Sequence, residues 1–211
     1  MTHRRTRPSG PIAVLAIVIA ALATSTGGAA ATDAVVGQSA PAFSLPDSKG
    51  TTHALSDYAG KIVVLEWVNH DCPFVKKHYE SGNMQKLQKQ ATAEGVVWLS
   101  VNSSAPGKQG NYPPDVWQKL TADKGAAPTA VLLDPDGKVG KEYGAKTTPH
   151  MYVIDGKGTL VYAGAIDDTP STNVYDVKTA KNLVAAALVE VEAGKPVSVA
   201  STTPYGCSVK Y

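Results

Sequence analysis

The pattern of apolar and polar positions predicts alternating strands and helices from residue 61 onward. The run KIVVLEWV at residues 61–68 is short and rich in β-branched side chains, as expected for a buried strand of a parallel sheet. Apolar residues then recur at helical spacing between residues 73 and 91, and a second buried strand is expected at residues 96–101. A strand, a helix and a strand in this order form a βαβ unit, whose crossover should be right-handed.

The second half of the chain predicts a further helix, a strand, a hairpin and a last helix. The helix is expected at residues 115–124, after a polar loop, and the strand at residues 130–133. Residues 151–154 and 160–164 flank the sequence DGKG, which is a strong hairpin signal. An Ala-, Leu- and Val-rich helix is expected at residues 178–193.

The N-terminal residues have the composition of a secretory signal. Arginines at positions 4, 5 and 7 precede an apolar segment at residues 12–23 and a cleavage-site sequence, AAA, at residues 29–31. The apolar segment is shorter than the roughly 20 residues of a membrane-spanning helix, although an uncleaved anchor is the alternative. We expect an exported protein, periplasmic or extracellular, without stable membrane insertion after the signal is removed.

Three parts of the chain follow from these patterns. They are the signal (residues 1–31), a folded domain (residues 32–193) that begins with a hairpin, and a tail without periodicity (residues 194–211). Removing the signal changes the formal charge from +2 to −1, because it carries three arginines and no acidic residue. The remaining Lys and Arg residues are scattered, so nothing in the domain favours a nucleic-acid partner.

Cys72 is the candidate nucleophile. It lies between the strand at residues 61–68 and Pro73, which suits the first turn of a helix. A helix N-terminus stabilises a thiolate, whereas the neighbouring Asp71 opposes it. The alternative is a buried structural cysteine. The second cysteine, Cys207, lies in the tail, and an even number of cysteines in an exported protein permits one disulfide.

Three further segments carry a family resemblance. They are the lead-in VGQSAPAFSL at residues 36–45, the sequence SDYAGK at residues 56–61, and Thr148-Pro149 just before the predicted hairpin. With the thiol after a strand, they make residues 35–193 resemble the redoxin branch of the thioredoxin-like superfamily, which includes the alkyl hydroperoxide reductase and thiol-specific antioxidant (AhpC/TSA) proteins.

The resemblance implies an α/β thioredoxin-like fold with a central mixed sheet flanked by helices. It implies a cis-Pro149 beside the thiol and a surface on which an extended substrate docks. By the same resemblance, Trp67, Pro73, Phe74, Thr148 and Pro149 would contact the substrate. A trans-proline leading into a strand is the alternative for Pro149, and a core position is the alternative for Trp67.

The departures from the family pattern are equally informative. The second cysteine of a C-x-x-C pair is replaced by Val75, so a vicinal disulfide cannot form. The Pro and Thr that peroxiredoxins place before their reactive thiol are replaced by Leu65 and Asn69, although the Asn69 amide could still bind a peroxide. Cys207 could serve as the resolving thiol, because the extended tail is long enough to reach Cys72.

The sequence therefore predicts a thiol–disulfide oxidoreductase or thiol-dependent peroxidase that uses Cys72 and Cys207. Its partners would be a disulfide-bearing protein or a small hydroperoxide and a thiol electron donor, with no cofactor. The alternative is a non-catalytic binding or chaperone module in which a structural Cys72–Cys207 disulfide pins the tail.

Glu66 and three histidines are further candidates for a role near Cys72. Glu66 interrupts the apolar strand and is either a buried proton shuttle for the thiol or a residue at a sheet edge. His70, His78 and His150 fall near Cys72 in the resemblance, and the copper-delivering Sco proteins use a related scaffold with two cysteines in C-x-x-x-C. Position 76 is Lys here, so copper delivery is the minor alternative and no metal ligands are assigned.

Overall fold

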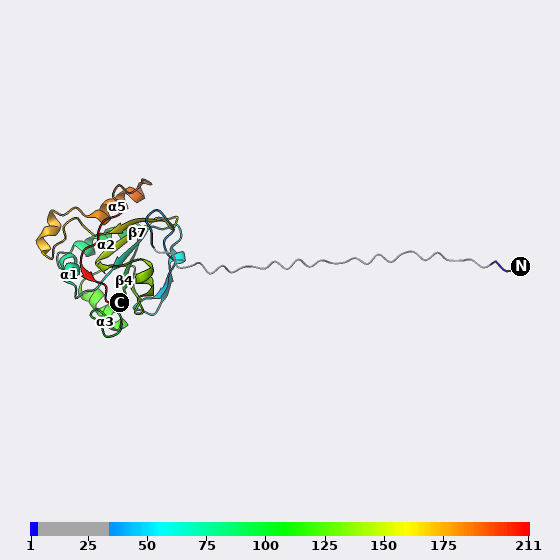
Figure 1. The fold of residues 1–211 in the computed structure, drawn as a ribbon, viewed down its shortest axis with the longest axis horizontal. Helices are drawn as coiled ribbons and strands as arrows, with labels where there is room; N and C mark the ends of the chain where they lie inside the picture. Colours follow the sequence, from blue (N-terminus) through cyan, green and yellow to red (C-terminus); the bar gives the residue numbers. More distant parts are fainter. Residues whose placement is uncertain (4–33) are drawn as a thin grey trace. The chain divides into compact units, whose positions relative to one another are not determined.

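A five-stranded mixed sheet is the centre of the molecule (Figure 1), as the sequence predicts. The computed structural model describes residues 1–3 and 34–211, so the apolar segment and cleavage site of the expected signal lie outside the described residues. The strand order is β5-β4-β3-β7-β8, in which β3, β4 and β5 are parallel and β7 and β8 run antiparallel to their neighbours. The strands are β3 (Val63–Trp67), β4 (Val97–Asn102), β5 (Ala130–Leu133), β7 (His150–Ile154) and β8 (Leu160–Gly164).

The helices lie close to their predicted positions, with two corrections. They are α1 (Pro73–Glu80), α2 (Asn83–Ala93), α3 (Pro114–Asp123), α4 (Lys138–Glu142) and α5 (Leu183–Glu192), with 3-10 turns η1 (Leu55–Tyr58) and η2 (Val174–Lys178). The single helix expected over residues 73–91 is two helices, because the chain turns at Gly82, whose φ of 75° favours glycine. The last helix begins at Leu183 and not at residue 178, because Asn182 is its N-cap and accepts from the Ala185 N–H.

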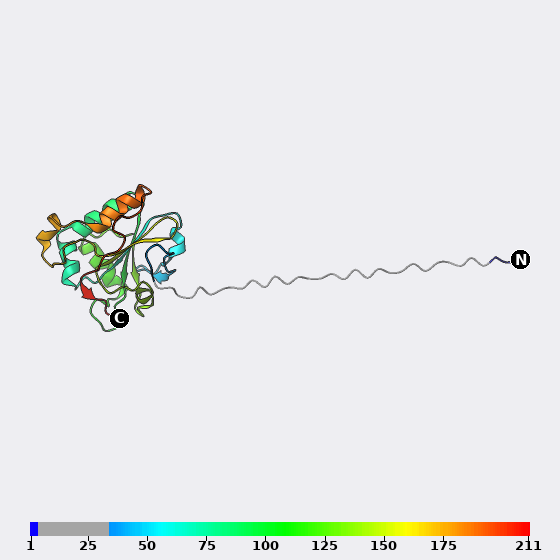
Figure 2. The same ribbon diagram turned by 45° about the horizontal axis from the view of Figure 1, so that its top comes forward.

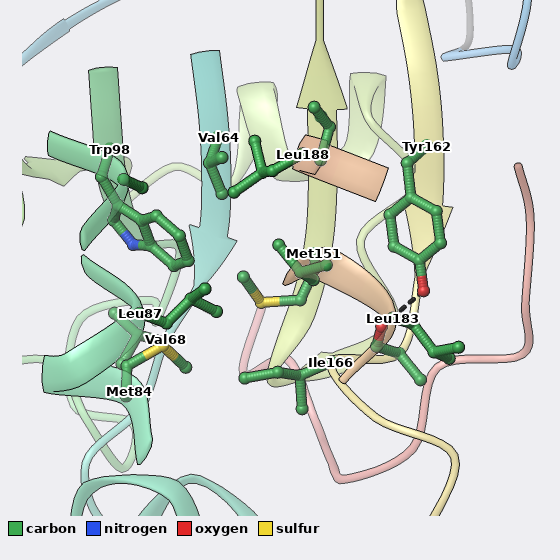
Figure 3. Close-up of a cluster of buried hydrophobic side chains, with 14 of the residues drawn as sticks. Val64, Val68, Met84, Leu87, Trp98, Met151, Tyr162, Ile166, Leu183 and Leu188 are labelled. Carbon is green, nitrogen blue, oxygen red and sulfur yellow. Dashed lines mark hydrogen bonds between the residues drawn. The ribbon is translucent and has the colours of Figure 1, made fainter. Parts of the chain in front are cut away.

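Each face of the sheet has its own apolar core. Helices α2 and α5 lie side by side over one face (Figures 1 and 2), where Leu87 and Leu188 pack with Val64 and Met151 (Figure 3). The other face packs against α4 and the N-terminal hairpin, through a separate cluster that includes Trp67. The central strands β3, β4 and β7 are buried at every position, because both faces of the sheet are covered.

Two small two-stranded ladders flank the central sheet. The N-terminal hairpin is formed by β1 (Ser44–Pro46) and β2 (Thr52–Ala54) and confirms the predicted hairpin. The second ladder pairs β6 (Thr147–Thr148) with β9 (Cys207–Ser208), which the sequence does not predict. This second ladder brings the tail of the chain to the position just before Pro149.

The tail is part of the folded unit and does not project from it. Residues 34–211 belong to one compact unit. The tail first runs along the free edge of β8, where Ala163 exchanges backbone hydrogen bonds with Ala200 and Thr202. None of the helices in the described part of the chain is long and apolar enough to cross a membrane.

Candidate active site

Cys72 is the N-cap of α1 and its side chain is fully buried. A short turn connects it to β3, in which the Cys72 N–H donates to the Asn69 carbonyl oxygen at 3.0 Å. Pro73 occupies the first turn of the helix, as the sequence predicts. The thiol therefore lies at the positive end of a helix, beneath the end of the central strand.

Cys207 meets Cys72 although 135 positions separate them in the sequence. The two sulfur atoms are free thiols that lie 2.7 Å apart. The Cys207 N–H also points at the Cys72 sulfur, at 3.4 Å, and the Thr148 carbonyl oxygen lies 3.0 Å from the same sulfur. The half-buried Cys207 thus gives Cys72 a second thiol, which a C-x-x-C pair would have supplied from position 75.

The two thiols have opposite pKa shifts. Burial by itself raises the pKa of Cys72, but hydrogen bonds from the Cys207 thiol and from the Val75 and Cys207 N–H groups together hold the pKa below its usual range. Burial and the neighbouring Cys72 sulfur raise the pKa of Cys207 to about 11. At neutral pH, Cys72 is the better thiolate and Cys207 is its hydrogen-bond donor.

The Thr148–Pro149 peptide bond is cis, which confirms the prediction for Pro149. Both residues are buried, and Thr148 pairs with Cys207 across the β6–β9 ladder. Gly206 allows this close approach, because a Cβ atom there would lie only 2.1 Å from the Thr148 carbonyl oxygen. The tail therefore covers the backbone just before the cis-proline.

A buried ion pair holds the tail beside the thiols. The Lys77 ammonium group and the Asp167 carboxylate lie 3.1 Å apart, and their side chains are at most 2% exposed. The Tyr205 hydroxyl donates to Asp167 and lies 3.2 Å from the His78 ring and 3.4 Å from the Lys77 nitrogen. Its ring also packs edge-to-face on Phe74, at 5.8 Å between centroids. The tail thus covers part of the surface predicted to contact substrate.

The Lys77–Asp167–Tyr205 network is not predicted from the sequence. No sequence signal marks Lys77 as buried, because it lies two positions from both Val75 and Tyr79 and therefore points away from the helix face that they share. A lysine is almost never fully buried without a partner. The identity of the partner depends on tertiary structure and has no sequence signal.

Glu66 is buried in the central strand, so its interpretation as a sheet-edge residue is wrong. Its carboxylate accepts four hydrogen bonds, at 2.8–3.0 Å, from the side chains of Tyr79, Gln88, Trp98 and Ser100. Burial raises the pKa of Glu66, and these donors partly offset the rise. Its hydrogen-bond partners come from α1, α2 and β4, and the Cys72 thiol is not among them. The contact expected of a proton shuttle is therefore not formed.

Two other predicted site residues have structural roles. Trp67 is fully buried in the core on the opposite face of the sheet, where its indole N–H donates to Ser103 at 3.0 Å, so it does not contact substrate. The Asn69 amide donates to the Gln109 carbonyl oxygen at 3.2 Å and accepts from the Asp71 N–H at 3.0 Å. Asn69 is buried and shapes the turn before Cys72 through these two bonds.

The histidines that could have supported copper delivery do not converge. His78 contacts Tyr205 and Asn83. The His150 Nδ1 atom accepts from the Lys146 N–H at 3.3 Å and lies 3.0 Å from the Tyr152 hydroxyl. Burial lowers the pKa of His70 to about 3 and the pKa values of His78 and His150 to about 4. In residues 34–211, no group of three or more His, Cys, Asp or Glu side chains is arranged to hold a metal ion.

The fold and the facing thiols define the class of this protein, which is a thioredoxin-like, thiol-dependent oxidoreductase. The chain belongs to the AhpC/TSA family, whose sequence model matches residues 36–163. It is 30% identical over 133 residues to the thiol-disulfide oxidoreductase ResA of Geobacillus kaustophilus, covering 61% of this chain and 68% of ResA.

Solved structures agree with this class. An uncharacterized conserved protein from Geobacillus kaustophilus superimposes with a TM-score of 0.71 at 27% identity, covering 84% of this chain and 92% of that protein. A Chlorobium tepidum protein assigned as a thiol:disulfide interchange protein, DsbE, gives a TM-score of 0.50 at 27% identity and covers 62% and 85% of the two chains.

Proposed function

We propose that this protein reduces disulfide bonds through a two-thiol cycle in which Cys72 is the nucleophile and Cys207 the resolving thiol. The observation that carries the proposal is the 2.7 Å contact between the two sulfur atoms, combined with their opposite pKa shifts. A low-pKa thiol attacks, and its protonated neighbour is retained for the second step.

The cycle consists of two exchange reactions. The Cys72 thiolate attacks one sulfur of a substrate disulfide, forms a mixed disulfide and releases the other substrate sulfur as a thiolate. Cys207 then loses its proton to solvent or to the released thiolate and attacks the Cys72 sulfur, which frees the second substrate thiol. The substrate gains two electrons, and the Cys72–Cys207 disulfide is reduced again by an external dithiol donor.

Thiol–disulfide exchange is better supported than peroxide reduction. At the peroxide-orienting positions of peroxiredoxins, Leu65 has no hydrogen-bonding side chain, and the buried Asn69 amide is engaged with the Gln109 carbonyl oxygen and the Asp71 N–H. A disulfide needs no peroxide-orienting group, because the nucleophile and the resolving thiol suffice. A hydroperoxide-consumption assay separates the two reactions, and rapid Cys72-dependent consumption would favour the peroxidase.

Trapping the mixed disulfide tests the cycle. A Cys207→Ser protein should accumulate a covalent adduct with a disulfide substrate on Cys72, detected by mass spectrometry, and the Cys72→Ser protein should form no adduct. Oxidation of the wild type should give an intramolecular disulfide, with the loss of two hydrogen atoms from the intact mass. If the Cys207→Ser protein forms no adduct with any disulfide, Cys72 is not the nucleophile.

A redox titration distinguishes the cycle from a permanent structural bond. A catalytic Cys72–Cys207 pair should equilibrate with glutathione or dithiothreitol buffers, whereas structural disulfides of secreted proteins have potentials below about −300 mV. A bond that resists these buffers would support the binding or chaperone alternative.

We also propose that the protein is exported, because residues 1–31 have the basic and apolar composition of a secretory signal. In an oxidising compartment, the Cys72–Cys207 pair would need a continuous supply of reducing thiols. Cell fractionation and N-terminal sequencing of the processed protein test the location and the cleavage site. An unprocessed protein that remains in the cytoplasm would contradict this part.

A further inference from the structure

The tail forms a short strand that pairs with the backbone just before Pro149. This pairing places the sulfur of Cys207 against the sulfur of Cys72. Strand β6 pairs antiparallel with β9, so that Thr147 lies opposite Ser208 and Thr148 opposite Cys207. β6 lies outside the central sheet, and its ladder partner is the tail. An exposed strand edge accepts an extended peptide by the same backbone hydrogen bonds.

We infer that Gly206–Ser208 occupies, as an internal pseudosubstrate, the edge on which an extended peptide containing Gly-Cys docks during the reaction. The inference rests on the proposed two-thiol cycle. In the observed register, a cysteine opposite Thr148 has its sulfur in contact with Cys72, which is the geometry needed for disulfide exchange. A substrate peptide must therefore displace the tail, and the tail must return to resolve the mixed disulfide.

The Gly206 backbone lies so close to the Thr148 backbone that the residue before the cysteine of a docked peptide should be glycine. A Cβ atom at this position would meet the Thr148 carbonyl oxygen at 2.1 Å and the Thr148 carbonyl carbon at 2.8 Å. These are backbone atoms, so the ladder has to shift to accommodate any side chain. A peptide that binds in this register should contain glycine at the same position, and Gly-Cys peptides should react faster than Val-Cys peptides.

The same contacts make the docking edge sensitive to the redox state. In the reduced protein, the strand is held by the Tyr205 anchor before it and by backbone bonds after it, such as the 3.0 Å bond from the Val209 N–H to the Lys146 carbonyl oxygen. In the disulfide form, the covalent bond fixes Cys207 on Cys72. The edge then stays closed to peptides until a dithiol donor reduces the protein.

The experiment compares proteins that differ only in how firmly the tail is seated. All contain Cys207→Ser, so that a peptide trapped on Cys72 is not released. Gly206→Ala unseats the strand by steric conflict with Thr148, and Val209→Pro unseats it independently by removing the backbone donor to Lys146. Gly194→Ala is the matched control, because Gly194 is also a tail glycine with positive φ but has no heavy atom within 4 Å of the added Cβ.

The probes are a short extended Gly-Cys peptide activated as a pyridyl disulfide, its Val-Cys counterpart, and a small aliphatic pyridyl disulfide. Gly206→Ala or Val209→Pro should raise the rate ratio of Gly-Cys peptide to small probe by at least about 10-fold, whereas Gly194→Ala should leave it unchanged. In the parent Cys207→Ser protein, the Gly-Cys peptide should also react faster with Cys72 than the Val-Cys peptide does.

The outcomes separate the inference from the proposed function. If all three probes accelerate equally when the tail is unseated, the tail only shields the thiol and the docking edge is refuted. The edge is also refuted if both unseating variants leave the ratio unchanged while circular dichroism shows a folded protein. If no probe reacts with Cys72 in any variant, the proposed two-thiol cycle itself fails.

Discussion

Cys72 and Glu66 are both buried polar groups at the central strand, yet their surroundings differ in origin. Every hydrogen bond to the Glu66 carboxylate comes from α1, α2 or β4, which form the core of the domain. The Cys72 sulfur has the Val75 N–H of its own helix as one partner, but its other partners come from Thr148 and from the terminal segment that carries Cys207. A group held by the core stays fixed, whereas a group held by a terminal segment can exchange its partner. Disulfide exchange requires the second arrangement.

The largest effect should come from removing the nucleophile. Cys72→Ser should lower disulfide-reductase turnover by at least about 100-fold, because the serine hydroxyl is a far weaker nucleophile at neutral pH. Its cost in the free energy of unfolding should stay at about 1 kcal/mol, since the side-chain volume changes little. Turnover with a dithiol donor and urea unfolding measure the two quantities. Turnover that survives in this variant would mean that Cys72 is not the reactive thiol.

Glu66 should show the opposite behaviour. Glu66→Leu leaves four buried donors unpaired and should lower the free energy of unfolding by about 4 kcal/mol. Glu66→Gln is the matched control. The amide oxygen that it introduces can keep three of the donors, and the new NH₂ group can donate to the Tyr79 hydroxyl, so the loss should be about 1 kcal/mol. Urea unfolding of both variants measures the difference.

The Glu66→Gln protein also tests the proton-shuttle hypothesis. An amide cannot exchange a proton as a carboxylate does, so a shuttle would be lost although the fold is retained. We expect turnover within about twofold of the wild type, because the change leaves the hydrogen bonds of Cys72 intact. A large fall in turnover without a loss of stability would restore the shuttle role.

The positions of Cys72 and Glu66 in the fold could be predicted from the sequence, because they depend on local patterns. The apolar run before Cys72 and Pro73 after it predict a strand and a helix start, and a charged residue inside that run predicts that Glu66 is exceptional. The partners of each group could not be predicted. Glu66 takes its donors from segments up to 34 positions away, and sequence periodicity carries no information on such contacts.

The β6–β9 ladder is the element for which sequence patterns fail completely. Each strand has only two residues, too few for an alternation of apolar and polar positions. The pairing joins Thr148 to Cys207 across the whole hairpin and last helix. Gly206 is a visible signal, since an isolated glycine can mark a close backbone approach, but the partner backbone cannot be identified from it.

His150 extends the comparison to a buried base held by the core. Its Nδ1 atom accepts from the Lys146 N–H, so this contact requires an unprotonated Nδ1, and burial lowers the pKa of the ring to about 4. Below pH 6.5 the unfolded chain binds a proton that the folded protein does not bind until about pH 4. Stability is therefore present above pH 6.5 and is lost as the pH falls toward 4, by up to roughly 3 kcal/mol for this residue.

Replacing the histidine isolates its share of the acid sensitivity. The amide oxygen of His150→Asn can accept as Nδ1 does but does not titrate, so the fall in stability between pH 6.5 and 4 should be smaller than in the wild type. Urea unfolding at several pH values measures both curves. Parallel curves would show that His150 titrates alike in the folded and unfolded chains. His70 and His78 should retain their own contributions in the variant.

The smallest expected effect is a shift in the pKa of Cys72 when the side chain of Cys207 is changed. Cys207→Ala removes the donor that helps to keep the pKa of Cys72 below its usual range, so the Cys72 titration midpoint should move to higher pH. In Cys207→Ser, the hydroxyl can donate in place of the thiol, and the midpoint should stay nearer that of the wild type. The ultraviolet absorbance of the thiolate reports Cys72 alone, because both variants lack the second cysteine. Equal midpoints in the two variants would mean that the side chain at position 207 does not help to lower the pKa of Cys72. Cys207 would then serve only as the resolving thiol.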